Sequence, residues 1–305
     1  MLDLERLRAL HAVARYGTVS AAADVLHVTT SAVSQQVAKL ERETGQKLLE
    51  RSGRGVRLTD AAELLVGHAE RILALVEAAQ SDLEAHRGAA VGELSMAAFP
   101  TAIRGLVAAA LGRLHNDHPQ LRVRVLEADP SDSIPLVARG ELDVAIVQDW
   151  NNEPLAIPEG LAKGVLCDDV ADLALPADHP LANQEVVQLK ELAGDPWITS
   201  SPSSICYHWL TRTLRATDNE PRIDHMAYEY GSQLAMVAAG FGAAILPRLG
   251  RLEVPAGVRV LPVRPLLSRR IYAIWRAEAA RRPAIRATVD ALRSVVPPPP
   301  AELVD

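Results

Sequence analysis

This sequence has few cysteines, few aromatic residues and no long apolar run. Its two cysteines, Cys167 and Cys206, are too few for a disulfide framework and favour a reducing compartment. With 4% aromatic residues, the cores must be built mainly from Ala, Leu, Val and Ile. The longest apolar run, Leu234–Leu246, contains glycines and is too short to span a bilayer of ~30 Å. Because the acidic first residues also lack the pattern of a signal peptide, we expect a soluble, cytoplasmic protein without a membrane partner.

Motifs for catalysis and metal binding are missing as well. The nine histidines are scattered, no Cys/His group has metal-site spacing, and neither a G-x-S-x-G nor a P-loop pattern occurs. The sequence therefore predicts no cofactor, no metal and no enzyme activity. Cys206 is a candidate redox thiol near a helix start, but Cys167, the other cysteine, is distant in sequence. A buried or inert Cys206 is the favoured interpretation.

Charge is distributed unevenly along the chain, whose formal net charge is −6. Residues 1–58 contain nine Lys+Arg and six Asp+Glu, whereas the remainder contains 23 and 32. A basic head on an acidic body indicates that only the head contacts phosphate.

The first 58 residues have the pattern of three short helices followed by two short strands. The expected elements are helices over 3–16, Ser20–His27 and Thr29–Thr44, with two strands around a turn in Lys47–Leu58. In the third helix, Val33, Val37 and Leu40 lie at i, i+4 and i+7 and form a buried stripe. Together these features are typical of a winged helix-turn-helix.

The opposite face of the third helix carries small hydroxyl and amide side chains, which are the DNA-contact candidates: Thr29, Thr30, Ser31, Ser34, Gln35 and Ala38. Short side chains let a helix enter the major groove closely, and Gln35 can reach a base edge. Three arginines of the expected wing, Arg51, Arg54 and Arg57, suit contacts to phosphates or to a narrow minor groove. A solvated basic loop is the alternative, but their position directly after a recognition helix favours DNA contact.

One long helix is expected over Asp60–Arg87, within a linker of residues 59–90. Its apolar residues alternate at spacings of three and four, and the predicted dimerisation seam is Leu65, Ala69, Ile72, Val76, Ala79 and Leu83. A heptad seam of this length predicts a coiled-coil-like dimer. The alternative is a helix packed only on its own domain.

After Gly88–Gly92, strand-like runs alternate with helical runs to about residue 296, which predicts a parallel α/β sheet. After Gly164 a second series of strands and helices is expected, beginning with a strand over Val170–Pro176. The last residues, 297–305, begin with four prolines and are expected to form a flexible, extended tail.

Residues 17–59, GTVSAAADVLHVTTSAVSQQVAKLERETGQKLLERSGRGVRLT, resemble the head of the LysR-type transcriptional regulators. The resemblance continues through HPQLRVRV, RGELDVAIV, LPADHPLA and MVAAGFGAAILP, and thus covers almost the whole chain to residue 296. Thr30 stands where the family often has Gln, and Gln35 where it often has Arg. We therefore expect a DNA sequence preference of its own.

The resemblance implies an α+β multidomain chain. It comprises an N-terminal winged helix-turn-helix (1–58), a long linker helix (59–90) and a C-terminal two-lobed α/β effector domain similar to a periplasmic binding protein (91–296). The expected lobes are about 91–163 with 267–296, and about 164–266.

By the same resemblance, loops at strand ends line a small-molecule pocket between the lobes. The candidate effector residues are Phe99, Pro100, Thr101, Ser131, Gln148, Ser200, Ser201, Ser203, Ser204, Gly231 and Ser232. Their hydroxyls and the nearby helix starts suit a polar or anionic effector. The alternative is that Ser and Thr only cap helices. Trp150 and Tyr207 are candidates for an aromatic wall.

The resemblance therefore implies a bacterial regulator that binds double-stranded promoter DNA as a homodimer or homotetramer and contacts RNA polymerase. A stand-alone solute-binding protein is one alternative, disfavoured by the basic head and the missing signal peptide. An α/β enzyme with an accessory DNA-binding domain is the other, and no catalytic motif supports it.

Overall fold

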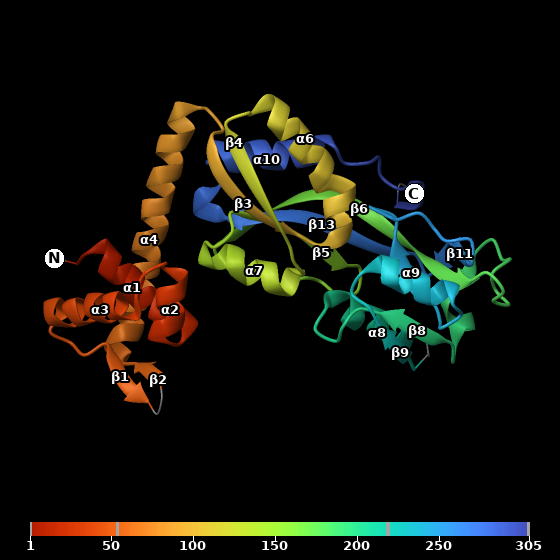
Figure 1. Cartoon of the computed structure of the whole chain (residues 1–305), viewed down its shortest axis with the longest axis horizontal. Helices are drawn as coiled ribbons and strands as arrows, with labels where there is room; N and C mark the ends of the chain where they lie inside the picture. Colours follow the sequence, from red (N-terminus) through yellow and green to blue (C-terminus); the bar gives the residue numbers. More distant parts are fainter. Residues whose placement is uncertain (1, 53–54, 218–219, 304–305) are drawn as a thin grey trace. The chain divides into compact units, whose positions relative to one another are not determined.

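The computed structural model describes residues 2–52, 55–217 and 220–303, which divide into two compact units, residues 1–83 and 84–305 (Figure 1). Within the described residues, none of the helices combines the length and the apolar composition that a membrane crossing requires. Each unit has cores of its own and is treated separately below.

The first unit consists of three helices, a hairpin and most of a long fourth helix. Its elements are α1 (Leu4–Tyr16), α2 (Val19–Val25), α3 (Thr30–Thr44), β1 (Leu49–Ser52), β2 (Gly55–Leu58) and α4 (Asp60–Arg87). The helix expected from Ser20 begins earlier, because the Thr18 hydroxyl accepts a hydrogen bond from the Ala21 amide and caps α2. The other predicted elements of the head are confirmed.

The seam predicted on α4 is divided between two environments. Ala69 is fully buried, and with Leu65 it packs against Leu7 and Leu10 of α1. The prediction that Ala69 lines a dimer seam is therefore wrong, because the head itself covers this residue. Further along α4 the predicted residues Ile72, Ala79 and Leu83 are exposed, and Val76 is half-buried. Leu64 and Leu75, outside the predicted seam, are also exposed.

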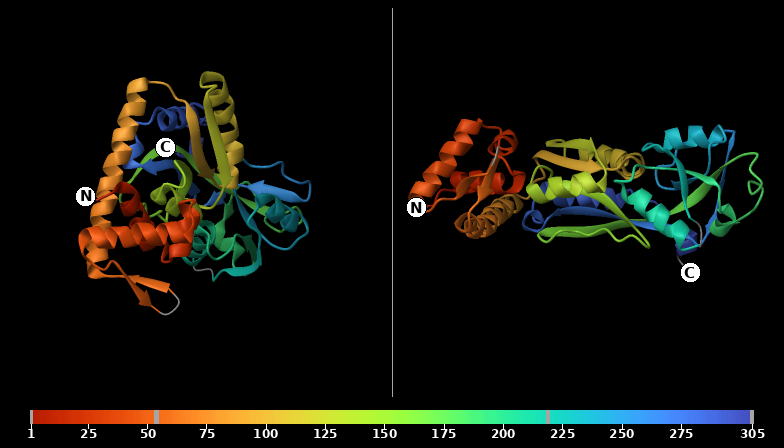
Figure 2. Two further views of the ribbon diagram at one scale, coloured as in Figure 1. Left: turned by 60° about the vertical axis from the view of Figure 1, so that its left-hand side comes forward. Right: turned by 90° about the horizontal axis from the view of Figure 1, so that it is seen from below.

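The second unit is built on a seven-stranded sheet in the order β10-β6-β13-β5-β3-β4, with β11 also paired to β6. The strands are β3 (Gly92–Ala98), β4 (Leu121–Glu127), β5 (Val144–Trp150), β6 (Leu161–Pro176), β10 (Ala244–Pro247), β11 (Val258–Leu261) and β13 (Leu267–Arg276). Strand β3 is parallel to β4 and β5, as predicted, whereas β13 is antiparallel to β5 and β6. The long strands β6 and β13 run from the first lobe into the second (Figure 1, Figure 2).

Helices cover both faces of the first lobe. One face carries a continuous helical segment, α5 (Pro100–Ala102), a π-turn η1 (Ile103–Val107) and α6 (Ala108–Asp117), together with α10 (Pro283–Ser294). The other face carries α7 (Pro130–Arg139). The second lobe contains β8 (Pro196–Thr199), α8 (Ile205–Arg215), β9 (Arg222–Met226) and α9 (Tyr230–Ala238). Minor elements are β7 (Val187–Gln188), η2 (Leu189–Leu192), β12 (Val263–Arg264), η3 (Ala277–Ala279) and η4 (Ala301–Leu303).

Two sequence expectations need correction in this unit. The lobe boundary placed at 163/164 lies inside β6, and Gly164 is part of that strand. A side chain there would lie 2.9 Å from Arg293 Nη2 and 3.0 Å from the Trp275 ring. The end of the Arg293 side chain can shift, whereas the Trp275 ring leaves little room, so a small residue suits this position of a continuous strand. The tail is not uniformly extended either, because Ala301–Leu303 forms a 3₁₀ turn.

Candidate functional site

The exposed face of α3 matches the requirements of a recognition helix. Val33, Val37 and Leu40 are buried against α1 and α2 or the neighbouring core. All six DNA-contact candidates on this face are exposed: Thr29, Thr30, Ser31, Ser34, Gln35 and Ala38. The Thr29 hydroxyl accepts a hydrogen bond from the Ala32 amide at 3.1 Å and so begins the helix. The remaining small side chains leave the backbone free to approach a base edge.

The turn between α2 and α3 is short and tightly determined. His27 adopts a left-handed backbone (φ 53°), and the Val28 amide donates to the Ala23 carbonyl at 3.0 Å. Ala22 and Ala23 are fully buried, since only small side chains permit the close crossing of the two helices. This connection fixes the angle at which α3 is presented.

The two strands of the wing pair in register, with Glu50 opposite Arg57. The Arg57 guanidinium donates to the Glu50 carboxylate at 2.7 Å, and both side chains are largely exposed. Arg51 is described only as part of β1, and Arg54 lies outside the described residues. The structure therefore leaves Arg57 accessible to a phosphate, in competition with Glu50.

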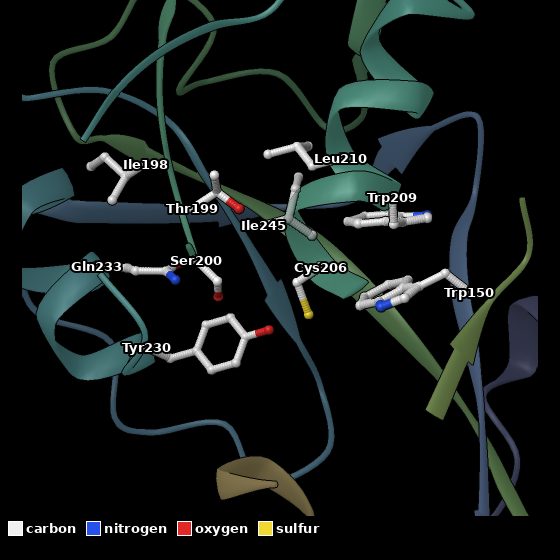
Figure 3. A pocket seen from close by; sticks show the side chains of 10 residues that line it. All are labelled: Trp150, Ile198, Thr199, Ser200, Cys206, Trp209, Leu210, Tyr230, Gln233 and Ile245. Carbon is white, nitrogen blue, oxygen red and sulfur yellow. The ribbon is translucent and has the colours of Figure 1, made fainter. Parts of the chain in front are cut away.

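A pocket lies where the second lobe meets the crossing strands (Figure 3). It is lined by Trp150, Ile198, Thr199, Ser200, Cys206, Trp209, Leu210, Tyr230, Gln233 and Ile245. The Trp150 and Trp209 rings stack with centroids 3.8 Å apart and form an aromatic wall. The centre of a water molecule can occupy about 10 Å³ of this space, which is room for roughly one water. The pocket is therefore closed to larger molecules in this arrangement.

A buried arginine on β13 connects the elements around the pocket. Arg269 pairs with Asp169 of β6 at 2.8 Å, donates to the Thr101 hydroxyl at 2.9 Å and also hydrogen-bonds the Gln148 carbonyl. Its guanidinium lies over the rings of Phe99 and Trp150, 5.3 and 5.6 Å from their centroids. Arg269 thus joins the start of α5 in the first lobe to the crossing strands.

Contacts around the π-turn η1 hold the first lobe close to the loop after β10. Arg104 Nε donates to the Gly250 carbonyl at 2.9 Å. A Cβ on Gly105 would lie 2.6 Å from the Leu249 side chain, so only glycine permits this approach. Leu249 is buried in the core of the first lobe, and its amide donates to Asp169. The closed pocket therefore coincides with tight packing between lobes.

The predicted effector residues fall into two groups. In the first group, Ser200 lines the pocket. Thr101, Gln148 and Phe99 contact Arg269. Pro100, next to Thr101, and Ser204, four residues after Ser200, are buried. The rest do not line the pocket: Ser131, Ser201, Ser203, Gly231 and Ser232. Ser201 and Ser203 are exposed and bonded to each other at 2.9 Å. An effector role for this second group stays a prediction.

Two of these serines lie at capped helix starts. Asp129 accepts a hydrogen bond from the Ser131 amide and caps α7, and Glu229 does the same for the Ser232 amide and α9. The cap is therefore the residue two or three positions before each serine. Burial raises the pKa of the Asp129 carboxyl, although the Ser131 amide opposes the shift.

Sequence reasoning missed Arg269, Asp169, Trp209 and Tyr230, whereas Trp150 forms the expected wall and Tyr207 does not line it. Arg269 and Asp169 are two of several charged residues on β13 and β6, and only the strand pairing, in which they lie directly opposite each other, distinguishes them. Without the register, the pair cannot be read from the sequence.

The two cysteines do not form a reactive pair. Both are free, and burial raises the pKa of the Cys206 thiol. Burial, assisted by Asp169, raises the pKa of Cys167 to about 12. A thiol held in its protonated form is a poor nucleophile. Across the described residues there is also no cluster of His, Cys, Asp and Glu suited to a metal ion.

Comparisons with known proteins agree with this architecture. Residues 4–63 match the family described as bacterial regulatory helix-turn-helix protein, lysR family, and residues 87–297 match the LysR substrate binding domain. An uncharacterised HTH-type transcriptional regulator, YnfL of Escherichia coli, is 30% identical over 253 residues, covering 81% of this chain and 82% of its own. The small neutral protease regulatory protein of Streptomyces lividans is 33% identical over 280 residues, covering 91% and 79%.

Solved structures share the fold. A full-length OxyR variant from Pseudomonas aeruginosa has a TM-score of 0.73 at 24% identity and covers 97% of both chains. Full-length CbnR in complex with its target DNA has a TM-score of 0.56 at 22% identity, covering 96% of this chain and 100% of its own.

Proposed function

The chain belongs to the LysR family of bacterial transcriptional regulators, whose members are not enzymes, and from this premise we propose how it works. It binds double-stranded promoter DNA through α3 and the wing, under control of a small polar effector held between its two lobes. The observation that carries the proposal is that α3 has one buried apolar face and one exposed uncharged face. Its apolar stripe is buried, while the six uncharged DNA-contact candidates are exposed together.

The effector proposed is a small polar molecule with hydrogen-bond acceptors. Trp150 Nε1 is buried, faces the Cys206 sulfur, and has no oxygen acceptor among the described residues. Ser200 and Thr199 add hydroxyls to the same pocket. The charge of Arg269 is already offset by Asp169, which favours acceptor groups rather than net negative charge as the recognised feature.

Effector binding would act by shifting a population of conformations. The closed pocket accepts about one water, so the lobes must move apart before an effector can enter. A change in lobe geometry would alter the spacing of paired heads and the bend of the DNA. Contact with RNA polymerase would follow from this, and the protein would act in the cytoplasm.

A homodimer, or a homotetramer built from dimers, suits promoters with two-fold related half-sites. The exposed apolar residues of α4 support this assembly: Leu64, Ile72, Leu75, Ala79 and Leu83. A row of exposed apolar side chains on one helix favours its packing against the same helix of a second chain.

Two measurements on the purified full chain test the proposal. Genomic footprinting at physiological salt should protect paired sites upstream of genes, and neighbouring genes would indicate the metabolite. A thermal-shift panel of polar metabolites should then give stabilisation without turnover. Absence of any protected site would reject the DNA-binding function, and turnover of a metabolite would support the enzyme alternative instead.

A further inference from the structure

The C-terminal tail is anchored at both of its ends, one on each lobe. It leaves α10, whose buried face packs into the core of the first lobe, and Val295 and Val296 continue that packing. The tail then runs toward the second lobe (Figure 1). The family profile ends at residue 297, so the tail lies outside the part of the chain that the family shares.

The far end of the tail reaches a preformed group of charges. Arg248 donates through Nε and Nη2 to both oxygens of the Asp172 carboxylate, each at 2.9 Å, and Arg251 donates to the same carboxylate at 2.7 Å. The Asp172 side chain is only 7% exposed and lies in the part of β6 that pairs with β10. Two arginines around one buried aspartate leave one positive charge uncompensated.

Glu302 supplies the missing negative charge. Its carboxylate accepts from Arg248 Nη1 at 2.8 Å, and both side chains are about one-third exposed. The 3₁₀ turn that carries Glu302 is closed by a hydrogen bond from the Leu303 amide to the Pro300 carbonyl at 3.0 Å. Its own backbone amide and Arg248 lower the pKa of the Glu302 carboxyl, so the pair is charged at neutral pH.

The segment between these anchors is stiff. Pro297–Pro300 has no backbone donor and fixed φ angles, and a run of four prolines extends about 12 Å in the polyproline II form. Pro297–Pro299 are exposed, so the segment is a spacer rather than part of a core. A stiff spacer between two fixed ends transmits strain instead of absorbing it.

We infer that residues 297–303 form a strap that joins α10 of the first lobe to the Arg248 site of the second lobe and restrains movement of the lobes. The strap is held to the second lobe by the Glu302 carboxylate, which pairs with Arg248. When the Glu302–Arg248 pair breaks, the lobes separate more often and the pocket opens more often. This inference does not depend on DNA binding or on the identity of the effector.

Cys206 offers a direct readout of pocket opening. It lines the pocket and is partly exposed, so the rate at which a bulky thiol reagent reacts with its sulfur should rise as the pocket opens. In a Cys167→Ala background the full chain reacts with dithionitrobenzoate through one thiol. We expect Glu302→Gln, and separately removal of residues 297–305, to accelerate the reaction about twofold to fivefold, as for loss of one partly exposed ion pair.

The matched control is Glu253→Gln, which removes the same charge from an exposed position of the second lobe for which the described residues show no ion pair. It should leave the rate unchanged. Added salt should accelerate the unsubstituted background but not Glu302→Gln. Equal rates for Glu302→Gln and the background would overturn the strap, as would equal acceleration by Glu253→Gln. Urea unfolding of each variant separates local opening from global destabilisation.

Discussion

Arg269 and Asp169 lie directly opposite each other on β13 and β6 and form an ion pair 2.8 Å long, with side-chain exposures of 1% and 6%. Asp169 also accepts a hydrogen bond from the Leu249 amide at 3.0 Å, and Arg269 reaches Thr101. Burying two charges costs desolvation energy, which such a network offsets only when nearly every donor and acceptor is used. The pair therefore fixes the relative position of the crossing strands and the start of α5.

The first prediction follows from this pair. Arg269→Gln removes the positive charge and leaves Asp169 buried without a counterion, which should lower the free energy of unfolding by about 3–5 kcal/mol. Urea unfolding monitored by circular dichroism measures it. The neighbouring Arg270→Gln is the control, because Arg270 and its partner Asp168 are substantially exposed and their loss should cost less than about 1 kcal/mol. Equal costs would contradict the role given to the buried pair.

The head was predictable from sequence because its signals are local. Helical spacing, the Thr29 cap and the glycine at the end of α3 act within one or two turns, and the apolar stripe of α3 has a period that no strand shares. The start of α2 was missed because Thr18 and Ser20 are both good caps. Only the geometry shows which hydroxyl meets an amide.

The pocket was predictable only in outline. Of the candidates at strand ends, Ser200 lines the pocket, and Thr101 and Gln148 contact Arg269. The remaining contacts depend on register and on strands that cross between lobes, such as the Arg269–Asp169 pairing. The lobe boundary at Gly164 was misplaced for the same reason, since the continuity of β6 through this residue is seen only in its pairing with β13.

The recognition helix gives the second prediction. Ser34→Glu places a negative charge on the exposed face of α3 and should abolish operator binding in gel shifts at physiological salt, because phosphates repel it. Dimerisation should be unchanged. Gln120→Glu adds the same charge to an exposed position of the other compact unit and should bind normally. Normal operator binding by Ser34→Glu would exclude α3 as the recognition helix.

The third prediction concerns the wing. Arg57→Ala should weaken binding to specific and nonspecific DNA alike and reduce the slope of log K against log salt by about one. Glu50→Gln should do the opposite and strengthen binding, because Glu50 holds the Arg57 guanidinium in the free protein. Affinities measured by fluorescence anisotropy from low to physiological salt test both expectations. An unchanged slope in Arg57→Ala would remove the wing from the phosphate contacts.

The fourth prediction is a pH dependence of the head. Burial lowers the pKa of His11 below its ordinary 6.5, an effect that the nearby Glu70 opposes. The unfolded chain then binds the proton more readily than the folded one. Stability due to this group is therefore present above pH 6.5 and is lost as the pH falls from there toward the folded pKa. Hydrogen exchange of α1 amides should show weaker protection at pH 5.5 than at pH 7.5, and His11→Gln should reduce this difference. An unchanged difference would assign the pH dependence to other groups.

The fifth prediction tests which face of α4 associates. Leu75 is 72% exposed, so Leu75→Glu should leave the stability of the head unchanged. If the exposed row on α4 is the dimer contact, the buried charge should weaken self-association about tenfold or more, as measured by sedimentation equilibrium. Ala69→Glu should behave differently, because Ala69 is buried in the head and the charge would unfold it. Gln80→Glu, an exposed polar position on the same helix, is the control for added charge. A dimer constant unaffected by Leu75→Glu would place the interface elsewhere on the chain.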